Sequence, residues 1–300
     1  MNYLIGIDIG GTRIKTVAVT FDGEVIEEYS RATGDDGTPA WRDNVAQAVA
    51  ALAARVGSAP AFIGLSAPGV PARDGFTIAS MPGRLPGLEN FQWQSVLNAP
   101  HRVPVLNDAQ AALLGEVWLG AARGVANAFL LTLGTGVGGA VLVDGRLLRG
   151  HLGRAGHLGH VSLDPLGDPD IVNTPGSLEQ AIGDCTVSAR TQGRFSTTHD
   201  LVTAATNGDV FAAAMWGKSV RVLGAAIISL INVLDPEVVV IGGGVAAAGD
   251  ALFVPLRAHL DRFEWRPGGA CVRLVPASLG NRAGALGAAR AALLSLSKTT

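Results

Sequence analysis

The 300-residue chain is long enough for one large domain or two ordinary ones, and 48% apolar residues with 40 glycines favour a turn-rich α/β protein. A net charge of −2 gives no signal for nucleic acid, and the longest apolar stretch, 223–234, is too short to cross a bilayer, so neither partner is expected. Two distant cysteines, Cys185 and Cys271, argue against a disulfide framework and a Cys-x-x-Cys metal site. With a first strand starting almost at Met1, no signal peptide is expected, and we predict a cytoplasmic protein.

The first segment, 4–19, predicts a β-hairpin, because two β-branched runs flank Gly10 and Gly11. We expect these glycines to take positive φ values and to bring backbone N–H groups close to an anion. Asp8 stands where the buried strand gives way to the turn, and a carboxylate there is costly unless it is paired or lies beside a metal ion. We hypothesise that the hairpin holds nucleotide phosphates while Asp8 faces the accompanying Mg²⁺. The alternative is an ordinary hairpin with a solvated aspartate.

The rest of the first half alternates strands and helices. The pattern predicts strands at 24–31, 60–65 and 103–106, and helices at 41–56 and 109–119. Between them, 71–87 has no period and is predicted to be a long surface loop, a kind of segment that is often functional in a compact domain.

A second strand–turn–strand segment, 130–143, repeats the first around Gly134, Thr135 and Gly136. The repetition indicates two similar halves that face each other across a cleft, each with a phosphate-binding turn. A third glycine turn, 242–244, follows a buried strand predicted at 238–241. The sequence contains neither a P-loop nor an early dinucleotide-binding fingerprint.

The remaining elements belong to the second half. They are an irregular segment at 150–175, helices at 177–182, 200–206, 209–234, 251–263 and 282–296, and short strands at 146–148 and 271–275. No linker marks a domain boundary. We place it near Asp108, which gives a small α/β domain, 1–107, and a large one, 108–282, with the last helix, 283–300, packing back on the first.

Asn107 and Asp108 come directly after a strand and before a helix. The helix dipole favours an ionised acid there, and such an acid could take a proton from an alcohol as the alcohol attacks a γ-phosphate. Spacing alone favours a plain helix N-cap, which aspartate commonly provides. The two glycine turns favour the catalytic role, because phosphate-binding turns need an acceptor's base nearby.

Together these segments resemble the ROK family, which contains bacterial sugar kinases and related repressors. The resemblance covers nearly the whole chain and rests on Asp8-x-Gly10-Gly11-Thr12, Asn107-Asp108, Gly134-Thr135-Gly136-x-Gly138-Gly139 and Gly242-Gly243-Gly244-Val245. It implies a two-domain actin-like (ribonuclease H-like) α/β fold with ATP and sugar in the cleft, Asp108 as the base that activates the sugar hydroxyl, and a homodimer. The residues expected at ATP and Mg²⁺ are Asp8, Gly10, Gly11, Thr12, Lys15, Gly134, Thr135, Gly136, Gly243 and Gly244. Those expected at the sugar are Gly69, Arg84, Asn107, Asp108, His157, His160 and Glu179.

Three departures from the family pattern concern the sugar pocket. Where the family has the motif Gly-Glu-x-Gly-His, this sequence has His157 in place of the glutamate. The family's zinc-binding cysteine cluster has no cysteine here, with Ser177 at the last cysteine's position, so structural zinc is not expected; the three histidines of 150–175 could form another metal site or act as plain hydrogen-bonding groups. Arg84 replaces the asparagine of Asn-Leu-Pro-Gly. Inside the pocket it would suit an acidic or phosphorylated acceptor; outside it is a surface arginine.

Two functions stay open. The first is an ATP-dependent kinase for a hexose or an N-acetylhexosamine, in which domain closure excludes water. The second is a catalytically weak or inactive sugar-binding regulator of the same fold, which the altered pocket favours. A DNA-binding repressor is disfavoured because only seven residues precede Asp8, and a filament protein because a base before a helix has no role there.

Overall fold

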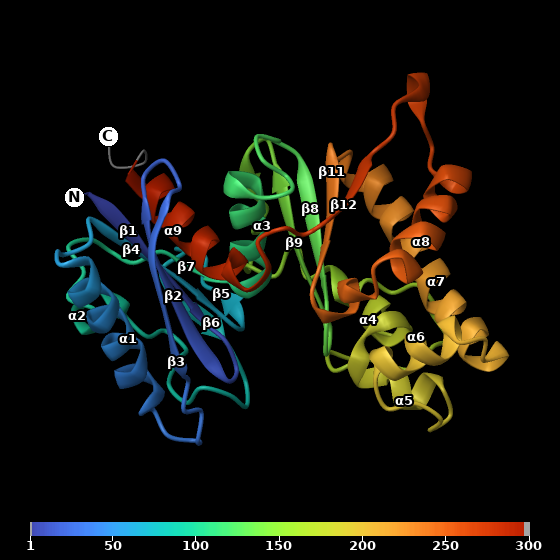
Figure 1. Cartoon of the computed structure of the whole chain (residues 1–300), viewed down its shortest axis with the longest axis horizontal. Helices are drawn as coiled ribbons and strands as arrows, with labels where there is room; N and C mark the ends of the chain where they lie inside the picture. Colours follow the sequence, from blue (N-terminus) through green and yellow to red (C-terminus); the bar gives the residue numbers. More distant parts are fainter. Residues whose placement is uncertain (1, 297–300) are drawn as a thin grey trace. The chain divides into compact units, whose positions relative to one another are not determined.

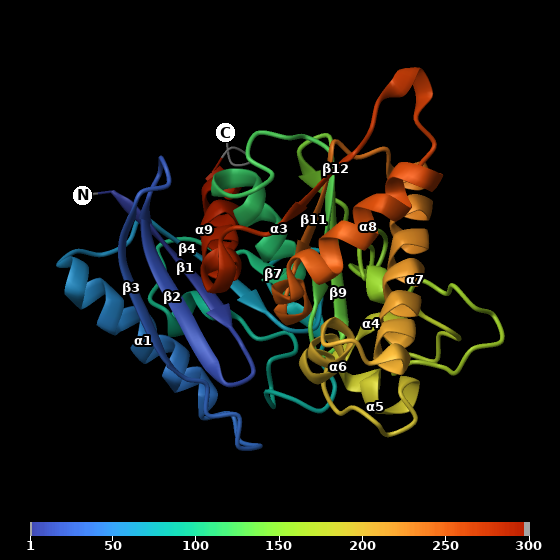
Figure 2. The ribbon, with the colours of Figure 1, turned by 45° about the vertical axis from the view of Figure 1, so that its right-hand side comes forward.

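The computed structural model describes residues 2–296, which form two compact units with separate hydrophobic cores. Unit 1 contains 2–124, 149–155 and 278–296, and unit 2 contains 125–148 and 156–277. Each unit has one five-stranded sheet covered by helices (Figures 1 and 2). The domain boundary near Asp108 stays a prediction; the helix that begins at this residue lies in unit 1.

The sheet of unit 1 has the strand order β3-β2-β1-β4-β7. Its strands are β1 (Tyr3–Ile9), β2 (Arg13–Thr20), β3 (Val25–Ala32), β4 (Phe62–Ala67) and β7 (Val105–Asn107). The first two form the predicted hairpin, β3 continues it antiparallel, and β4 and β7 run parallel to β1. Because β1 and β7 run in the same direction, Asp8 and Asn107 lie toward the same edge of the sheet, where ligands bind in open α/β sheets.

Helices α1 (Trp41–Val56) and α9 (Ala283–Leu296) pack on opposite faces of this sheet (Figure 1). The apolar stripe of α1 enters the core, and Gly57 in the left-handed conformation ends the helix. α9 approaches the sheet closely because Gly6 and Gly64 have no side chain; a methyl group on either would overlap the α9 backbone. α3 (Asp108–Leu119) packs on α9 through Gly115, and a short helix, α2 (Trp93–Val96), completes the unit.

The segment 71–87 is more than the predicted surface loop. β5 (Val70–Pro71) and β6 (Ile78–Ser80) pair as a two-stranded sheet, and Ile78 and Leu85 are buried in the core of unit 1. The prediction is wrong here because isolated apolar residues at irregular spacing give no periodic signal. The loop is therefore anchored at several points along its length.

The sheet of unit 2, in the order β10-β9-β8-β11-β12, repeats the plan of the first. Its strands are β8 (Ala128–Leu133), β9 (Val137–Val143), β10 (Arg146–Leu147), β11 (Val238–Gly242) and β12 (Arg273–Pro276). β8 and β9 form the second predicted hairpin, and β11 and β12 run parallel to β8. The helices of the unit are α4 (Leu178–Ile182), α5 (Val187–Arg190), α6 (Thr198–Thr206), α7 (Val210–Leu234) and α8 (Asp250–Phe263).

Among the described residues, α7 alone is long and apolar enough to cross a membrane by length and composition. This corrects the expectation that the apolar stretch 223–234 is too short, because the helix begins at Val210 and its first turns are also apolar. One face of α7, with Trp216, Leu223 and Ile227, is buried in the core of unit 2. A buried face of this kind is typical of a core helix in a globular domain.

Candidate functional site

Asp8 lies near the end of β1 and its carboxylate is partly buried. Ser66 Oγ donates to its Oδ1 at 2.9 Å, and a methyl group on Gly284 of α9 would lie 2.7 Å from its Cγ. Burial raises the pKa of Asp8, the Ser66 hydrogen bond and Lys15 lower it, and the negative charge of Asp108 raises it further; the net shift is upward. A bound cation would offset the unfavourable effect of burial on the ionised carboxylate. One carboxylate together with phosphate oxygens is a donor set that suits Mg²⁺.

The turn between β1 and β2 is held from the side by Thr33. Its Oγ1 donates to the Gly10 carbonyl at 2.7 Å, and its N–H donates to the Thr12 carbonyl at 2.9 Å. The prediction of positive φ values is wrong, because neither Gly10 nor Gly11 has one. Space explains the second glycine instead: a methyl group on Gly11 would lie 2.5 Å from a terminal nitrogen of Arg84. The bare backbone makes room for a guanidinium on the turn.

Lys15 follows this turn on β2, and its Nζ donates to Asn281 Oδ1 at 3.4 Å. With Arg13 and Arg282 it lines a cavity of about 500 Å³ in unit 1. Glu28 also lines it and pairs with Arg282 at 2.9 Å. Three basic groups thus face a single acid, and the cavity is cationic.

Asn107 and Asp108 stand at the N-terminus of α3. Asn107 is the N-cap: its Oδ1 accepts the Ala109 N–H at 3.0 Å, and Gln110 Oε1 accepts the Asn107 N–H at 3.4 Å in a capping box. The capping role that the sequence left open for Asp108 therefore belongs to its neighbour. Asp108 is the first helical residue, is exposed, and accepts the Ala109 N–H at 2.7 Å. An exposed carboxylate at this position is a candidate acceptor for the proton of a substrate hydroxyl.

Among the residues predicted at the sugar, Asn107 contacts Gly69, and Arg84 contacts the first glycine turn. Asn107 Nδ2 donates to the Gly69 carbonyl at 3.0 Å. Arg84 Nε lies 3.5 Å from Asp35 Oδ2, and its terminal nitrogens rest against Gly11. Arg84 thus lies at the first glycine turn, a position that neither alternative from the sequence considered.

The turn between β8 and β9 is fixed by backbone hydrogen bonds. Gly134 N–H donates to the Gly136 carbonyl at 2.9 Å, and the N–H groups of 184–185 donate to the carbonyls of Gly134 and Thr135 at 2.9 and 2.8 Å. Neither Gly134 nor Gly136 has a positive φ, as in the first turn. A methyl group on Gly136 would overlap the carboxylate of Glu179. Here too glycine makes room for a charged side chain.

Glu179 on α4 reaches the second turn. Its Oε2 accepts the N–H of Val137, the first residue of β9, at 2.9 Å. The start of α4 is set by its N-cap, Ser177, whose Oγ accepts the Gln180 N–H at 3.3 Å. The carboxylate expected at the sugar therefore lies against the backbone of a turn expected at phosphates.

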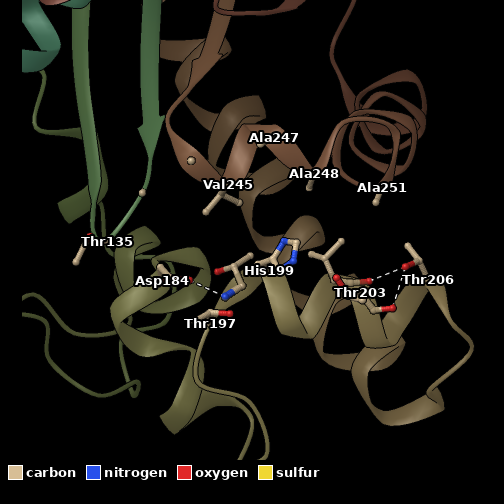
Figure 3. Close-up of a pocket in the computed structure, with 14 residues that line it drawn as sticks. Thr135, Asp184, Thr197, His199, Thr203, Thr206, Val245, Ala247, Ala248 and Ala251 are labelled. Carbon is tan, nitrogen blue, oxygen red and sulfur yellow. Dashed lines mark hydrogen bonds between the residues drawn. The ribbon is translucent and has the colours of Figure 1, made fainter. Parts of the chain in front are cut away.

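A cavity of about 530 Å³ adjoins this turn within unit 2 (Figure 3). Figure 3 shows His199 of α6 between Thr203 on its own helix and Val245 on the segment that follows β11. Gly244, expected near the nucleoside, lines the cavity, and its neighbour Gly243 has a φ of +85°. The volume lies in the range of small-molecule sites and is large enough for a nucleoside. Sequence reasoning missed the α6 residues, because a threonine- and histidine-rich helix start carries no motif.

The histidine-rich segment is organised around Asp170. His160 Nδ1 donates to its Oδ2 at 2.8 Å, and the N–H groups of Val172 and Thr174 each donate to its Oδ1 at 2.9 Å. Burial raises the pKa of Asp170, but the hydrogen bonds from His160, Thr174, Ser177 and Val172 outweigh it and keep that pKa below its ordinary value. A buried carboxylate thus joins His160 to Ser177, the residue at the position of the family's last cysteine.

This network bears on the expected absence of zinc, which stays a prediction. Among residues 2–296, no group of three or more His, Cys, Asp or Glu side chains is arranged to hold a metal ion. The segment lacks thiolates, and Asp170 holds it by accepting hydrogen bonds, so the residues present do not fit a structural zinc. His157 immediately precedes the 3₁₀ turn Leu158–His160.

Comparison with known proteins gives matches over nearly the whole chain. The family model described as ROK family matches residues 4–294. A glucokinase from Halalkalibacterium halodurans is 34% identical, with 95% of this chain and 93% of the relative covered. An N-acetylmannosamine kinase from Shigella boydii is 31% identical, with 95% and 96% covered.

Solved structures agree with the sequence relatives. A ROK hexokinase from Thermus thermophilus has a TM-score of 0.85 at 31% identity, with 99% of each chain covered. A ROK family glucokinase from Streptomyces griseus, solved in complex with glucose and AMPPNP, has a TM-score of 0.75 at 27% identity, with 97% of this chain and 99% of the other covered. The likeness extends over both units of the fold.

Proposed function

Because the chain belongs to the ROK family, we propose that it transfers the γ-phosphoryl group of ATP to a hydroxyl of a hexose or an N-acetylhexosamine. The chain has the two-domain actin-like α/β fold and is an ATP-dependent carbohydrate kinase. Which sugars it accepts, and which residues act on them, are the substance of the proposal.

The observation that carries the proposal is the position of Asp108. Its carboxylate is exposed at the N-terminus of α3, and it is close enough to Asp8 for its charge to raise the pKa of that residue. In the proposed reaction Asp108 accepts the proton of the sugar hydroxyl while the hydroxyl oxygen bonds to the γ-phosphorus. The bond from that phosphorus to the bridging oxygen breaks, and ADP leaves with the electron pair.

Each glycine turn offers groups that suit a part of the nucleotide. Asp8, with Lys15 on the neighbouring strand, suits the phosphate end and its metal ion; Mg²⁺, when bound, would draw charge from the phosphate oxygens. The cavity beside Gly134, lined by His199 and Gly244, suits the nucleoside. The glucokinase relative solved with AMPPNP supports ATP as the donor.

The residues that we expect to bind the sugar include Asn107 and Gly69 in unit 1 and His157, His160 and Glu179 in unit 2. The glucokinase and N-acetylmannosamine kinase relatives support a neutral or N-acetylated hexose. The homodimer expected from the family stays a prediction.

The test is a coupled assay of ADP release by the full chain with Mg·ATP and a panel of neutral, N-acetylated and acidic sugars. We expect release with at least one neutral or N-acetylated hexose, and a loss of about 10³-fold in kcat for Asp108→Asn, because a general base contributes that much. The matched control is Asp250→Asn, which changes the first residue of α8 and should leave kcat unchanged.

Two results would contradict the proposal. Absence of sugar-dependent ADP release across the panel would favour the alternative of a sugar-binding regulator. Full activity of Asp108→Asn would remove this residue from the mechanism.

A further inference from the structure

The guanidinium of Arg84 lies on the first glycine turn. A methyl group placed on Gly11 would be 2.5 Å from one terminal nitrogen of Arg84, 3.4 Å from the other and 3.3 Å from Cζ. The whole end of the guanidinium thus faces the backbone at this residue. A side chain at residue 11 would displace the end of Arg84 from this position.

The loop that carries Arg84 is held in an unusual conformation. Leu85 has a φ of +48°, in the left-handed region that a bulky residue rarely adopts, and yet it is almost fully buried. Asp35 accepts the Leu85 N–H at 3.2 Å, Trp41 Nε1 donates to the carbonyl of residue 86 at 3.3 Å, and Arg42 donates to the carbonyl of residue 87. Backbone strain that is fixed by so many contacts is typical of functional segments.

The ion pair of Arg84 leaves its terminal nitrogens at the turn. The pair joins Nε to Asp35 Oδ2 at 3.5 Å, and 43% of the Arg84 side chain remains exposed against 16% of the Asp35 side chain. Asp35 therefore holds the guanidinium through Nε and leaves its two terminal nitrogens available. The forked end is presented where an anion on the turn would lie, and a guanidinium binds phosphate through two parallel hydrogen bonds.

We propose that Arg84 is a catalytic residue that binds the γ-phosphate of ATP at the first glycine turn and follows it through transfer. The proposal rests on the proposed kinase function. While the sugar oxygen bonds to the γ-phosphorus, the proton passes to Asp108 and ADP leaves with the electron pair; Arg84 stabilises the negative charge on the peripheral oxygens of the phosphoryl group. An acidic sugar is the less favoured ligand, because the guanidinium lies against Gly11 in the turn that is expected to bind phosphates.

The first test measures nucleotide binding to the full chain by calorimetry with Mg²⁺ and no sugar. For Arg84→Ala we expect the Kd of AMPPNP to rise about tenfold and the Kd of ADP to stay unchanged, because a hydrogen bond to a charged group contributes roughly that much and only AMPPNP has a γ-phosphate. The control is Arg73→Ala, which removes an exposed arginine from the same loop. An unchanged AMPPNP affinity, or an equal loss for ADP, would overturn the proposal.

The second test measures steady-state kinetics. Arg84→Ala should lower kcat/KM for ATP about 100-fold, as removal of a transition-state donor does, while KM for the sugar changes less than about threefold. Arg84→Lys should recover part of the loss, because it restores the charge but not the fork. A raised sugar KM with normal kcat would instead make Arg84 a sugar contact and overturn the proposal.

The third test uses the contact between residues 11 and 84. Gly11→Ala should weaken AMPPNP binding in the wild-type background and add little in the Arg84→Ala background, whereas additive losses would contradict the proposal. Because binding is measured without sugar, these outcomes are independent of turnover. If the wild-type chain were inactive on every sugar, the proposed kinase function would be wrong. The change in the Kd of AMPPNP relative to that of ADP would still decide whether Arg84 binds the γ-phosphate.

Discussion

The two glycine turns of this protein share a backbone plan and differ in their side chains. In each sheet an antiparallel hairpin is extended by a further antiparallel strand on one side and by two parallel strands on the other. Just before the first turn Asp8 pairs with Lys15, whereas at the matching register of the second hairpin Thr132 pairs with Gly138. The acid suited to a metal ion, and the cation beside it, therefore occur only in the first hairpin.

The side chains that rest on the turns carry opposite charges. The guanidinium of Arg84 lies on Gly11, and the carboxylate of Glu179 lies on Gly136 and accepts the Val137 N–H. The first turn is therefore suited to anions. The second adjoins a cavity of about 530 Å³ and already has a carboxylate bound to its backbone. A repeated strand–turn–strand pattern thus predicts the repeated fold but not a repeated chemistry.

The largest expected effect comes from removing the acid that the first hairpin alone possesses. Asp8→Asn should lower kcat about 10²- to 10³-fold at saturating ATP. Asp8 would hold the Mg²⁺ that stabilises charge on the phosphoryl group, and the loss of one electrostatic contact in an active site has about that size. The loss should be accompanied by a higher Mg²⁺ requirement. Steady-state rates over a Mg²⁺ titration would measure both, with Asp36→Asn as an exposed aspartate control.

A pH profile would sharpen this prediction. Since burial raises the pKa of Asp8, the active ionised form is lost at a higher pH than for an ordinary aspartate. A bound cation favours the ionised form, so the acid limb of kcat/KM should move to lower pH as Mg²⁺ increases. An acid limb that ignores Mg²⁺ would count against Asp8 as its ligand.

The next effect concerns the carboxylate on the second turn. Glu179→Gln retains an oxygen that can accept the Val137 N–H but removes the charge. If Glu179 also contacts the sugar, the KM of this variant for the sugar should rise about tenfold, because hydrogen bonds to charged groups are stronger than hydrogen bonds between neutral groups. Glu237→Gln is the matched control, since Glu237 accepts the N–H groups of Ala126 and Asn127 away from the turn. Equal, small effects of the two changes would restrict Glu179 to holding the backbone.

The third prediction tests the network around Asp170. Asp170→Ala leaves the N–H groups of Val172 and Thr174 and the His160 ring without their acceptor, which should cost about 2 kcal/mol of unfolding free energy. Chemical denaturation would measure it, and Asp164→Asn, at an exposed aspartate of the same segment, should cost less than about 0.5 kcal/mol.

The sign of the pH dependence follows from the lowered pKa of Asp170. Its stabilising contribution is complete above the unfolded value of about 3.9 and is lost as the pH falls through the lower folded value. Wild type should therefore lose this contribution only below about pH 4, and Asp170→Ala should lack that part of the acid dependence. Metal analysis of the purified chain should find no bound zinc; stoichiometric zinc that chelation removes with a loss of stability would contradict this account.

Much of the fold could be predicted because it is encoded locally. The apolar stripe of 41–56 predicts α1 with the bounds that the structure shows, and the helix predicted at 209–234 is α7, with Asp209 as its N-cap. The positions of Arg84 and Glu179 could not be predicted, because each meets its turn through contacts between segments distant in the chain. The turns also show why φ was mispredicted: sequence alone does not reveal whether a glycine is needed for its dihedral angle or for space.

The smallest expected effect concerns the cavity that only the second turn adjoins. His199 lies among the cavity-lining residues in Figure 3, and an aromatic ring there could stack on a nucleobase. His199→Ala should raise KM for ATP about fivefold, near the low end of base–aromatic stacking, and leave KM for the sugar unchanged. His101→Ala, which removes a ring stacked on Phe62 in unit 1, is the control. A rise in the KM for the sugar rather than in the KM for ATP would mean that the cavity beside the second turn does not hold the nucleoside. The assignment of the nucleoside to this turn would then be wrong.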